Sequence, residues 1–574
     1  MASNKKINPD TGHEMGCLCC SGTRIDEVSR EVERDVTVGD LASPSFAAES
    51  LAAASDALPF RLDDYAGLAT YRGKIIADQE RIIEQIDSGR MIQTGGNTIS
   101  FGFLDKDHTL GIYNNPKYGF PQPEGYSPFS EAQKQATRES MALWDDLIPQ
   151  DIIEKNGANG ADILFSNTTT GPAQASAYYP GNGLKYQGDV WVATPEVNWT
   201  NDWLGFNGYG ATTIIHEAGH ALGLSHPGAY NFGPGFAVTY ANGAEYAQDS
   251  EQFSIMSYWA PSETGAVAID FRTFQFGNGQ TPMIHDILTV QAKYGADPTT
   301  RAGDTVYGYN STAGRDVYDM NLNPFPLLAI YDAGGEDTID MSGTNAGVFL
   351  DLRDGSFSSA AADMPTAAAI TAARAELFAL AGLPAPAPFS QASANANEAF
   401  YKAQIAGRIA GNTGVTGVEA MGHQNLSIAY GTVIENAIGS SERDYLVGNQ
   451  ISNKLNGNGG NDVLNGLGGD DILTGGAGRD EFRFTEIGGT DKITDFTSGS
   501  DTINLSEIDA NGAMAGNQAF AFIGSSAFTN VAGELRSYTE NGSNFLAGDV
   551  DGNGVADFVI DLGNAPIVPA DILF

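Results

Sequence analysis

The sequence predicts an α+β protein, in which an N-terminal mixed α/β domain is followed by an all-β parallel β-roll that carries a helical insertion. Three observations support this fold class. Helical and strand-like periods alternate up to about residue 297. From residue 298 onward, short β-branched runs are separated by Gly, Asp and Asn turns. Around residue 450, glycines recur every nine residues, which is typical of a repeat architecture.

The 574 residues are too many for one ordinary core, so we expect at least two domains. Residues 1–59 lack a sustained period and read as a leader or propeptide, mostly disordered. Residues 60–297 contain a helical period in S-E-A-Q-K-Q-A-T-R-E-S-M-A-L-W-D-D-L and strand-like runs in T-I-S-F-G-F-L and A-D-I-L-F-S. Residues 298–574 form the all-β region. Within it, residues 358–412 combine helix formers with a Gly/Pro stop and predict the helical insertion, which we expect to decorate the roll or else to bind a surface partner.

Acidic residues outnumber basic ones by 71 to 30, giving a net charge of -41. This charge disfavours binding to nucleic acid or to an anionic membrane. Bound divalent cations would relieve the repulsion, although acidity could also serve only solubility. The three cysteines, Cys17, Cys19 and Cys20, all lie in the leader, so we expect no disulfides in the folded part. No segment reads as a membrane span or as an N-terminal signal peptide, so export would use another address.

The string T-T-I-I-H-E-A-G-H-A-L-G-L-S-H-P-G predicts a zinc site. On a helix, His216 and His220 lie one turn apart on the same face, so both rings can bind one cation. Gly223 can turn the chain sharply, so that His226 supplies a third nitrogen from outside the helix. A helix with structural histidines is the simpler alternative. However, three of the seven histidines fall within eleven positions, beside a glutamate.

Three protein ligands leave the fourth zinc position open for water, which is typical of a catalytic site. The bound water would have a pKa of about 7. Glu217 would accept its proton as the water attacks a peptide carbonyl and then deliver the proton to the leaving amine. The sequence therefore predicts one catalytic zinc ion and a metalloendopeptidase.

This long signature resembles the metzincin clan, and the following S-I-M-S-Y-W is similar to the Met-turn of the serralysin family. The resemblance implies that Met256 packs beneath the zinc site. It also implies that Tyr258 is a fifth zinc ligand that swings away to stabilise the oxyanion. Both could instead be simple core residues. The leader is longer than the short propeptides that the resemblance implies, and a cysteine thiolate could occupy the open zinc position in the zymogen, although an unstructured tail is the simpler reading.

The segment Q-A-S-A-Y-Y-P-G is similar to the upper edge strand of that family, where an extended substrate would pair as an added antiparallel strand. The resemblance implies broad specificity and substrate contacts at Ala175, Ser176, Ala177 and Tyr178. An ordinary edge strand remains the alternative.

The nine-residue repeat resembles the repeats-in-toxin β-roll, which binds several structural calcium ions. Its units begin at Gly439, Gly448, Gly457, Gly466 and Gly475. Position six is Asp444, Asn453, Asp462, Asp471 and Asp480, and position eight is always apolar. The first two units have Glu442 and Ile451 in place of the position-four glycine, so we expect calcium only at the last three. The expected ligands are Gly457, Gly459, Asp462, Gly466, Gly468, Asp471, Gly475, Ala477 and Asp480. Without calcium, stacked aspartates would repel and the roll would be disordered.

Two further strings predict calcium sites outside the repeat. G-D-T-V-Y-G and I-Y-D-A-G-G-E-D-T-I-D are similar to the junction of serralysins. There the resemblance implies ligands at Arg301, Gly303, Asp304, Gly334, Gly335 and Asp337. D-V-D-G-N-G-V-A-D is similar to part of an EF-hand loop and offers Asp549, Asp551, Asn553 and Asp557, although Ile560 replaces the bidentate Glu.

The resemblance also implies partners and location: protein or peptide substrates, a proteinaceous inhibitor, and a type I secretion exporter that reads the terminal A-D-I-L-F. We expect a secreted, extracellular monomer. Two alternatives from other classes remain: a non-catalytic calcium-dependent surface or adhesion protein with a lapsed zinc site, and a calcium-roll lipase. The lipase would need a G-x-S-x-G nucleophile elbow, which the sequence lacks.

Overall fold

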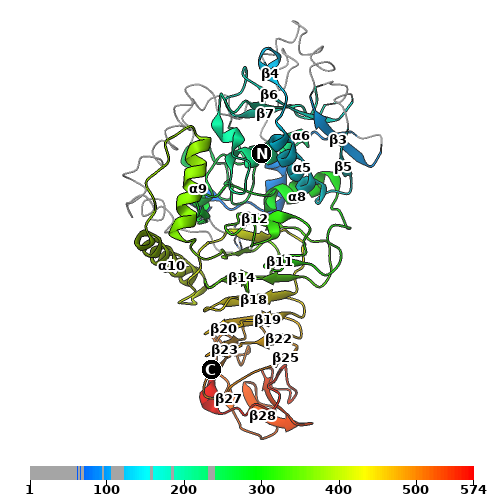
Figure 1. The fold of residues 1–574 in the computed structure, drawn as a ribbon. Helices are drawn as coiled ribbons and strands as arrows, with labels where there is room; N and C mark the ends of the chain where they lie inside the picture. Colours follow the sequence, from blue (N-terminus) through cyan, green and yellow to red (C-terminus); the bar gives the residue numbers. More distant parts are fainter. Residues whose placement is uncertain are drawn as a thin grey trace.

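The computed structural model describes residues 61, 65, 67, 70–93, 96–104, 122–155, 160–181, 186–230 and 239–574. The N-terminal elements form one end of an elongated molecule, the coils of the roll are stacked beneath them, and β27 and β28 lie near the other end (Figure 1). Cys17, Cys19, Cys20 and the predicted leader lie outside the described residues.

A mainly parallel sheet forms the frame of the N-terminal half, in the order β5-β3-β6-β8-β7. The strands are β5 (Asp151–Glu154), β3 (Thr98–Phe103), β6 (Ile163–Thr168), β8 (Val190–Ala193) and β7 (Ala175–Ala177). The edge strand β7 is antiparallel to β8, and β4 (Tyr126–Ser127) is antiparallel to β6. Two short hairpins complete the strands of this half: β1 (Thr70–Tyr71) with β2 (Lys74–Ile75), and β9 (Ile269–Asp270) with β10 (Gln275–Phe276).

Helix α5 (Glu131–Asp145) begins where the sequence predicts it, because Ser130 and Gln133 form a capping box. It packs against α6 (Tyr209–Ala221), and the buried Trp144 indole donates a hydrogen bond to Ile215 O at 3.1 Å. The remaining α-helices of this half are α3 (Gln79–Ile86), α7 (Tyr240–Gly243) and α8 (Ile284–Tyr294). Short 3-10 helices span Gln122–Gly125, Trp199–Asp202 and Pro261–Thr264, with others later at Asp316–Tyr318 and Pro569–Asp571.

The repeat forms a roll in which successive nine-residue units alternate between two parallel sheets. One sheet has the order β14-β18-β21-β24-β26-β31, and the other begins β11-β13-β17-β19-β22-β25 and continues through β30, β29, β28 and β27. Leu446 therefore pairs with Leu464, and Leu464 with Phe482, eighteen residues apart. The five position-eight side chains are at most 1% exposed, which confirms the predicted inward stacking: Leu446, Leu455, Leu464, Leu473 and Phe482.

The strands of the roll are short. In the first coils they are β11 (Val306–Gly308), β12 (Leu328–Ile330), β13 (Thr338–Asp340), β14 (Phe349–Asp351), β15 (Phe357–Ser358), β16 (Leu426–Ile428) and β17 (Asn436–Ile438). In the repeat they are β18 (Tyr445–Asn449), β19 (Lys454–Asn456), β20 (Gly459–Gly460), β21 (Val463–Leu467), β22 (Ile472–Thr474), β23 (Ala477–Gly478), β24 (Glu481–Arg483), β25 (Thr490–Ile493) and β26 (Thr502–Asn504). β12, β16 and β15 form a small separate sheet.

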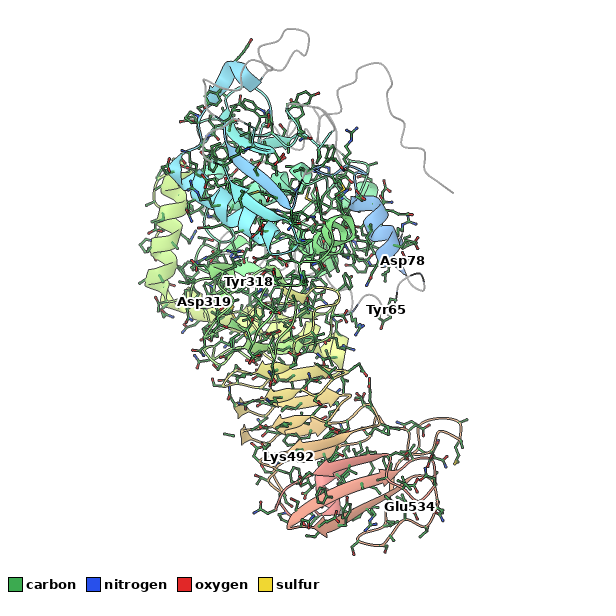
Figure 2. All side chains as sticks on the ribbon, turned by 90° about the vertical axis from the view of Figure 1, so that its right-hand side faces the viewer. Tyr65, Asp78, Tyr318, Asp319, Lys492 and Glu534 are labelled. Carbon is green, nitrogen blue, oxygen red and sulfur yellow. The ribbon has the colours of Figure 1, made fainter. Side chains whose placement is uncertain are left out.

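A C-terminal unit closes the roll. It contains β27 (Ala521–Phe522), β28 (Glu534–Glu540), β29 (Ser543–Asp549), β30 (Phe558–Asp561) and β31 (Ile572–Leu573). β28, β29 and β30 pair antiparallel, whereas β27 is parallel to β28 and β31 is parallel to β26. Figure 2 shows Lys492 of β25 on the stacked coils and Glu534 of β28 on this terminal unit. The A-D-I-L-F segment is itself structural, because β31 pairs with β26 and Asp571 accepts hydrogen bonds from Ser498 and Gly499.

The predicted insertion contains two helices, α9 (Ala367–Leu380) and α10 (Gln391–Thr413). The expectation that the insertion decorates the roll stays a prediction, and the structure adds contacts between the insertion and the N-terminal half. Tyr401 lies 5.0 Å from Phe271 between ring centroids, and Phe389 lies 4.9 Å from Phe274. The Arg408 guanidinium donates to Gly265 O at 3.2 Å. Large aromatic side chains at 271 and 274 need cover, and the insertion supplies it.

Buried apolar side chains from both halves form one continuous cluster that extends from Tyr71 to Ile572. The predicted domain boundary at residue 297 stays a prediction. Among the described residues, no helix is both long and apolar enough to cross a membrane.

Candidate functional site

The structure brings the three predicted histidines together. His216 and His220 project from α6, and His226 follows the turn after it. One ring nitrogen of each lies within 4.8 Å of the other two. The Nε2 atoms of His220 and His226 are 3.2 Å apart. Three rings from one short segment therefore face a common point.

Backbone carbonyls fix the orientation of each ring. The Nδ1 atoms lie 2.7 Å from Ile255 O for His216, 2.7 Å from Leu224 O for His220 and 3.1 Å from Tyr230 O for His226. A carbonyl can only accept, so each Nδ1 carries the proton and each Nε2 keeps a lone pair. Burial lowers the pKa of His216 to about 4, which keeps its ring neutral.

This donor set fits a zinc ion. Neutral imidazoles with their second nitrogen bonded to a carbonyl are the usual ligands of zinc. The buried His216 Nε2 and Glu217 Oε2 find no hydrogen-bond partner among the described residues. A buried acceptor atom without a hydrogen-bond donor is unfavourable unless a cation or a proton binds it.

Gly223 makes the turn that delivers His226. Its φ is +96°, and a Cβ there would lie 2.0 Å from Arg90 O, so a larger residue would not fit. The N-terminal segment clamps this turn, since Ser88 Oγ donates to Gly223 O at 2.6 Å and Ser225 N donates to Ile86 O at 2.6 Å. These clamping residues carry no recognisable motif, so sequence reasoning missed them.

Glu217 is 1% exposed, and burial raises its pKa above the ordinary value. Tyr258 lies beside the cluster, with its ring centroid 4.3 Å from that of His226 and 6.3 Å from that of His216. Met256 is fully buried against α6, because a Cβ on Gly219 would lie 2.7 Å from its Sδ. Sequence reasoning did not single out Gly219, although a small residue between two ligands on one helix is a usable signal of close packing.

The predicted substrate strand is the edge strand β7, where Ala175, Ser176 and Ala177 pair with β8 on one side. All three are buried, and β7 packs against α6. Tyr178 packs on Tyr186 at 5.1 Å between ring centroids, and the neighbouring Tyr179 ring lies 5.6 Å from that of His220. The edge strand and the histidine cluster are therefore adjacent.

The first predicted calcium cluster is also brought together. A Cβ on Gly335 would lie 2.7 Å from the Gly303 carbonyl carbon, and Asp337 Oδ1 accepts from Thr305 N at 2.8 Å. Asp304 accepts from Glu336 N at 3.0 Å. The Arg301 side chain instead binds Asp146, which leaves its carbonyl as the ligand atom. The other predicted member, Gly334, has φ +139°.

Glu435 is a residue of this cluster that sequence reasoning missed. Its carboxylate accepts from Asp337 N at 2.7 Å, and burial with neighbouring acids raises the pKa of Asp337 to about 7. Glu435 lies about a hundred residues from Asp337 in sequence, across the insertion, so no local motif connects them.

In the repeat, each position-six carboxylate reaches back to the preceding coil. Asp462 Oδ1 accepts from Asp444 N at 2.8 Å, and Asp480 Oδ1 accepts from Asp462 N at 2.9 Å. Asp471 makes the same bond to Asn453 N at 2.8 Å. A Cβ on the position-one glycine would lie 1.9 to 2.4 Å from the second carboxylate oxygen of its own unit, at Gly457, Gly466 and Gly475. Position one must therefore be glycine.

The environment of these carboxylates favours a bound calcium ion over carboxylates without a cation. Burial and the charges of Asp444 and Asp480 raise the pKa of Asp462 to about 9. Its Oδ2 has no hydrogen-bond partner among the described residues. A Cβ on Gly457 would lie 2.3 Å from Asp462 Oδ2 and 2.7 Å from Gly475 O. A carboxylate oxygen and a carbonyl oxygen, both ligand types of calcium, therefore lie next to the same glycine. The remaining predicted ligands in these coils are Gly459 and Ala477, which lie on the paired strands β20 and β23, and Gly468.

The ladder extends beyond the predicted units. Asp491 accepts from Asp471 N at 2.9 Å, and Asp501 accepts from Asp480 N at 3.1 Å. Their separations are 20 and 21 residues rather than 18, so a search for a strict period missed both.

The C-terminal loop holds Asp549, Asp551 and Asp557 with carboxylate oxygens within 4.8 Å of one another. Backbone amides already use much of this capacity, because both oxygens of Asp549 accept from glycines at 2.7 and 2.8 Å. The predicted ligand Asn553 instead donates to Asp551 and accepts from Val555 N.

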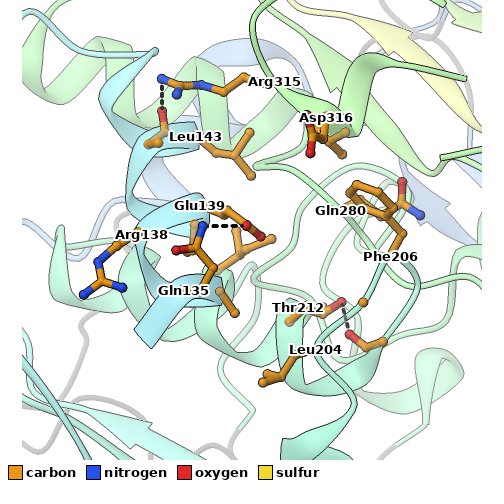
Figure 3. Close-up of a pocket in the computed structure, with 18 of the residues that line it drawn as sticks. Gln135, Arg138, Glu139, Leu143, Leu204, Phe206, Thr212, Gln280, Arg315 and Asp316 are labelled. Carbon is orange, nitrogen blue, oxygen red and sulfur yellow. Dashed lines mark hydrogen bonds between the residues drawn. The ribbon is translucent and has the colours of Figure 1, made fainter. Parts of the chain in front are cut away.

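A separate cavity of about 570 Å³ lies between α5, the start of α6 and the loop at Leu204 and Phe206 (Figure 3). Its walls include Leu143 and Thr212, with Arg138 and Glu139 near its rim. None of the three histidines lines it, so it is distinct from the candidate metal centre.

Comparison with known proteins supports the same reading. The family described as "Peptidase M10 serralysin C terminal" matches residues 296–372 and 409–574, and the gap between the two ranges falls within α9 and α10. Metallopeptidase AprA of Pseudomonas marginalis is 37% identical over 446 residues, which are 76% of this chain and 79% of the relative. Serralysin G of Dickeya chrysanthemi is 34% identical over 466 residues, 78% and 81% of the two chains. Serralysin of Photorhabdus luminescens is 34% identical over 459 residues, 78% and 80%. The chain therefore belongs to the serralysin family of metzincin metalloproteases.

Proposed function

We propose that the chain is a secreted zinc endopeptidase that hydrolyses peptide bonds in protein substrates with broad specificity. The observation that carries this proposal is the convergence of one ring nitrogen from each of the three histidines, with Glu217 next to His216 on the same helix. His216, His220 and His226 would hold the zinc. When bound, zinc supplies a water of lowered pKa and polarises the carbonyl of the peptide bond.

The side chains around the site supply the proton transfers and the binding. Glu217 accepts a proton from the attacking water and delivers it to the amine of the leaving product. The Tyr258 hydroxyl donates a hydrogen bond to the carbonyl oxygen as negative charge develops there. Strand β7 binds the substrate backbone in an extended conformation, which selects little by side chain.

Calcium supports the fold. We propose that oxygens of the three repeat units, of the 301–337 cluster with Glu435, and of the 549–557 loop bind structural calcium ions. A chain that stays unfolded in calcium-poor cytoplasm and folds in calcium-rich medium is suited to a type I exporter. We also propose that the chain is a monomer and that its partners include a type I exporter and a proteinaceous inhibitor.

The test is cleavage of casein and of a mixed peptide pool by the full-length protein loaded with zinc and calcium. Glu217→Gln keeps the size of the side chain and should lower kcat by about 10³-fold or more with normal zinc content. Tyr258→Phe should lower kcat by about 10- to 100-fold. The exposed Glu196→Gln serves as the matched control and should leave kcat unchanged.

Two results would contradict the proposal. If Glu217→Gln kept more than a tenth of the parent kcat, Glu217 would not be the general base. A folded, zinc-loaded parent that cleaves none of the peptides would leave the alternative of a calcium-dependent adhesion protein.

A further inference from the structure

A buried acid near the histidine cluster, Asp249, lies outside the zinc signature. Its side chain is fully buried and accepts three hydrogen bonds. Tyr230 OH donates to Oδ1 at 2.7 Å, Ser257 Oγ donates to Oδ1 at 2.7 Å, and Trp259 Nε1 donates to Oδ2 at 3.2 Å.

The first of these bonds leads to His226. Tyr230 holds that ring in two ways: its backbone carbonyl accepts from His226 Nδ1 at 3.1 Å, and its own ring stacks on the imidazole at 5.6 Å and 9°. Tyr230 is in turn tethered through its hydroxyl to Asp249. His226 comes from a turn rather than from the rigid helix, so its position depends on such supports.

The other two bonds lead to Tyr258. Ser257 and Trp259 are its two chain neighbours, and Asp249 binds the side chains of both. Trp259 N also donates to Ser257 Oγ at 3.2 Å, and Trp259 O accepts from Glu251 N at 2.8 Å. The backbone on each side of Tyr258 is therefore fixed to one carboxylate, and this limits where the phenol can lie.

We propose that Asp249 is a positioning residue that sets the third zinc ligand, His226, and the hydroxyl of Tyr258 relative to each other. The proposal rests on the proposed zinc peptidase function. A carboxylate suits the task because all three partners are donors and it offers only acceptor sites. An amide in its place would point an N–H group at a donor.

A second buried carboxylate, Asp286, supports another of the three histidines. Asp286 accepts from Ser254 Oγ at 2.7 Å, Ile255 N at 2.6 Å and Met283 N at 2.8 Å. Ile255 O accepts from His216 Nδ1, so Asp286 supports the first ligand and the start of the same turn. Asp249 supports its end. His216 and His226 are thus each supported by a buried acid.

The experiment compares Asp249→Asn with Asp270→Asn, a buried carboxylate of the same half that pairs with Arg272. Four quantities are measured on the full-length protein: kcat, KM, zinc retained against a competing chelator, and the absorption spectrum of the cobalt-substituted protein. Asp249→Asn should lower kcat about 10- to 100-fold with KM within about threefold, release zinc at about tenfold lower chelator, and alter the cobalt spectrum. Asp270→Asn should change none of these.

The double variant with Tyr258→Phe separates the two arms. In that background, Asp249→Asn should lower kcat by less than in the parent, because one of the groups it positions is gone. Its effect on zinc retention should persist, because that effect passes through Tyr230 and His226. Tyr230→Phe removes the hydrogen bond to Asp249 and should reproduce the zinc effect. Ser257→Ala removes the hydrogen bonds of Ser257 Oγ to Asp249 and from Trp259 N and should reproduce the kcat effect. Both variants test the proposal if Asp249→Asn fails to fold.

Unchanged zinc retention and an unchanged cobalt spectrum in Asp249→Asn would overturn the proposal. The proposal would also be overturned if Asp249→Asn and Asp270→Asn lost the same thermal stability and the same kcat, because the kcat loss would then follow from instability alone. Zinc retention and the cobalt spectrum do not require peptidase activity. A failure of the proposed function, seen in Glu217→Gln, is therefore distinguishable from a failure of this inference.

Discussion

The candidate metal ligands of the two halves differ in charge: they are imidazoles in the N-terminal half and carboxylates in the roll. In the N-terminal half, three imidazole rings are held by backbone carbonyls, and burial lowers the pKa of His216 and of His220. In the roll, buried carboxylates stack one coil apart, and burial together with the charges of Asp444 and Asp480 raises the pKa of Asp462 to about 9.

This difference separates the two roles of the metals. Neutral ligands repel one another weakly, so the zinc site can be assembled by the protein before the ion binds. Stacked carboxylates disfavour the folded state unless a cation bridges them. Zinc loss should therefore stop the chemistry and leave the fold, whereas calcium loss should remove part of the fold.

The largest expected effect is that of calcium removal. In hydrogen–deuterium exchange, chelation of calcium should make the strands of the repeat, β19 to β24, exchange freely. The amides of α6 should keep most of their protection, because its packing on α5 does not depend on calcium. Equal loss of protection in both regions would show that the two halves unfold as one unit.

Asp462→Asn sharpens this test. The amide keeps the acceptor for Asp444 N but removes one charge from the stack. We expect the calcium-free variant to be more stable than the calcium-free parent and to bind calcium more weakly, as followed by calcium titration of the circular dichroism signal. Greater instability in the absence of calcium would argue against repulsion as the cause.

The junction between the halves should respond next. Asp146, at the end of α5, binds Arg301 at 2.7 Å and Arg315 at 2.6 Å, and the Arg301 side chain is only 9% exposed. Asp146→Ala leaves these arginines unpaired and should cost about 3–5 kcal/mol of unfolding free energy. Denaturant unfolding followed by probes in each half should then show two separated transitions. Glu336→Ala, which breaks an exposed pair with Lys454, should cost less than about 1 kcal/mol.

A smaller effect is expected within the zinc helix. Gly219→Ala would place a methyl 2.7 Å from Met256 Sδ and 3.1 Å from the Trp144 ring. We expect a loss of about 1–3 kcal/mol in thermal unfolding, with weaker zinc retention. Gly407→Ala, in the interior of α10 with open space at its Cβ, should instead gain about 0.5–1 kcal/mol. A neutral Gly219→Ala would mean that Met256 moves aside without cost.

The smallest effect concerns pH. His423 bridges to Val267 across the halves, and burial lowers its pKa to about 3. The unfolded chain, with an ordinary pKa of about 6.5, binds the proton more tightly, so stability is full above about pH 6.5 and decreases toward pH 3. His423→Gln should lose about 1–2 kcal/mol less than the parent between pH 7 and pH 5, as measured by denaturant unfolding. Identical pH profiles would exclude His423 as the source.

Local chemistry explains which parts were predictable. The zinc ligands and Gly223 lie within eleven residues, and the repeat glycines are required by their own carboxylates, so both leave a pattern in the sequence. The supports of the site lie elsewhere: Tyr230, Asp249 and Asp286 act through tertiary hydrogen bonds, and no local motif marks the residues that make them. Glu435 joins its cluster only because the chain folds back across the insertion. The contact of the insertion with Phe271 and Phe274 likewise depends on tertiary packing that periodicity does not encode.

The alternation of units between two sheets constrains how such a protein can change in length. Loss or gain of a single nine-residue unit would transfer every later strand to the opposite face, so the terminal unit, with β31 still paired to β26, would emerge on the opposite side of the roll from the N-terminal half. Two units lost or gained together would keep the faces and only shorten or lengthen the stack. Natural variation in the number of repeats should therefore proceed in multiples of eighteen residues, with the odd extra residues before Asp491 and Asp501 accommodated in loops.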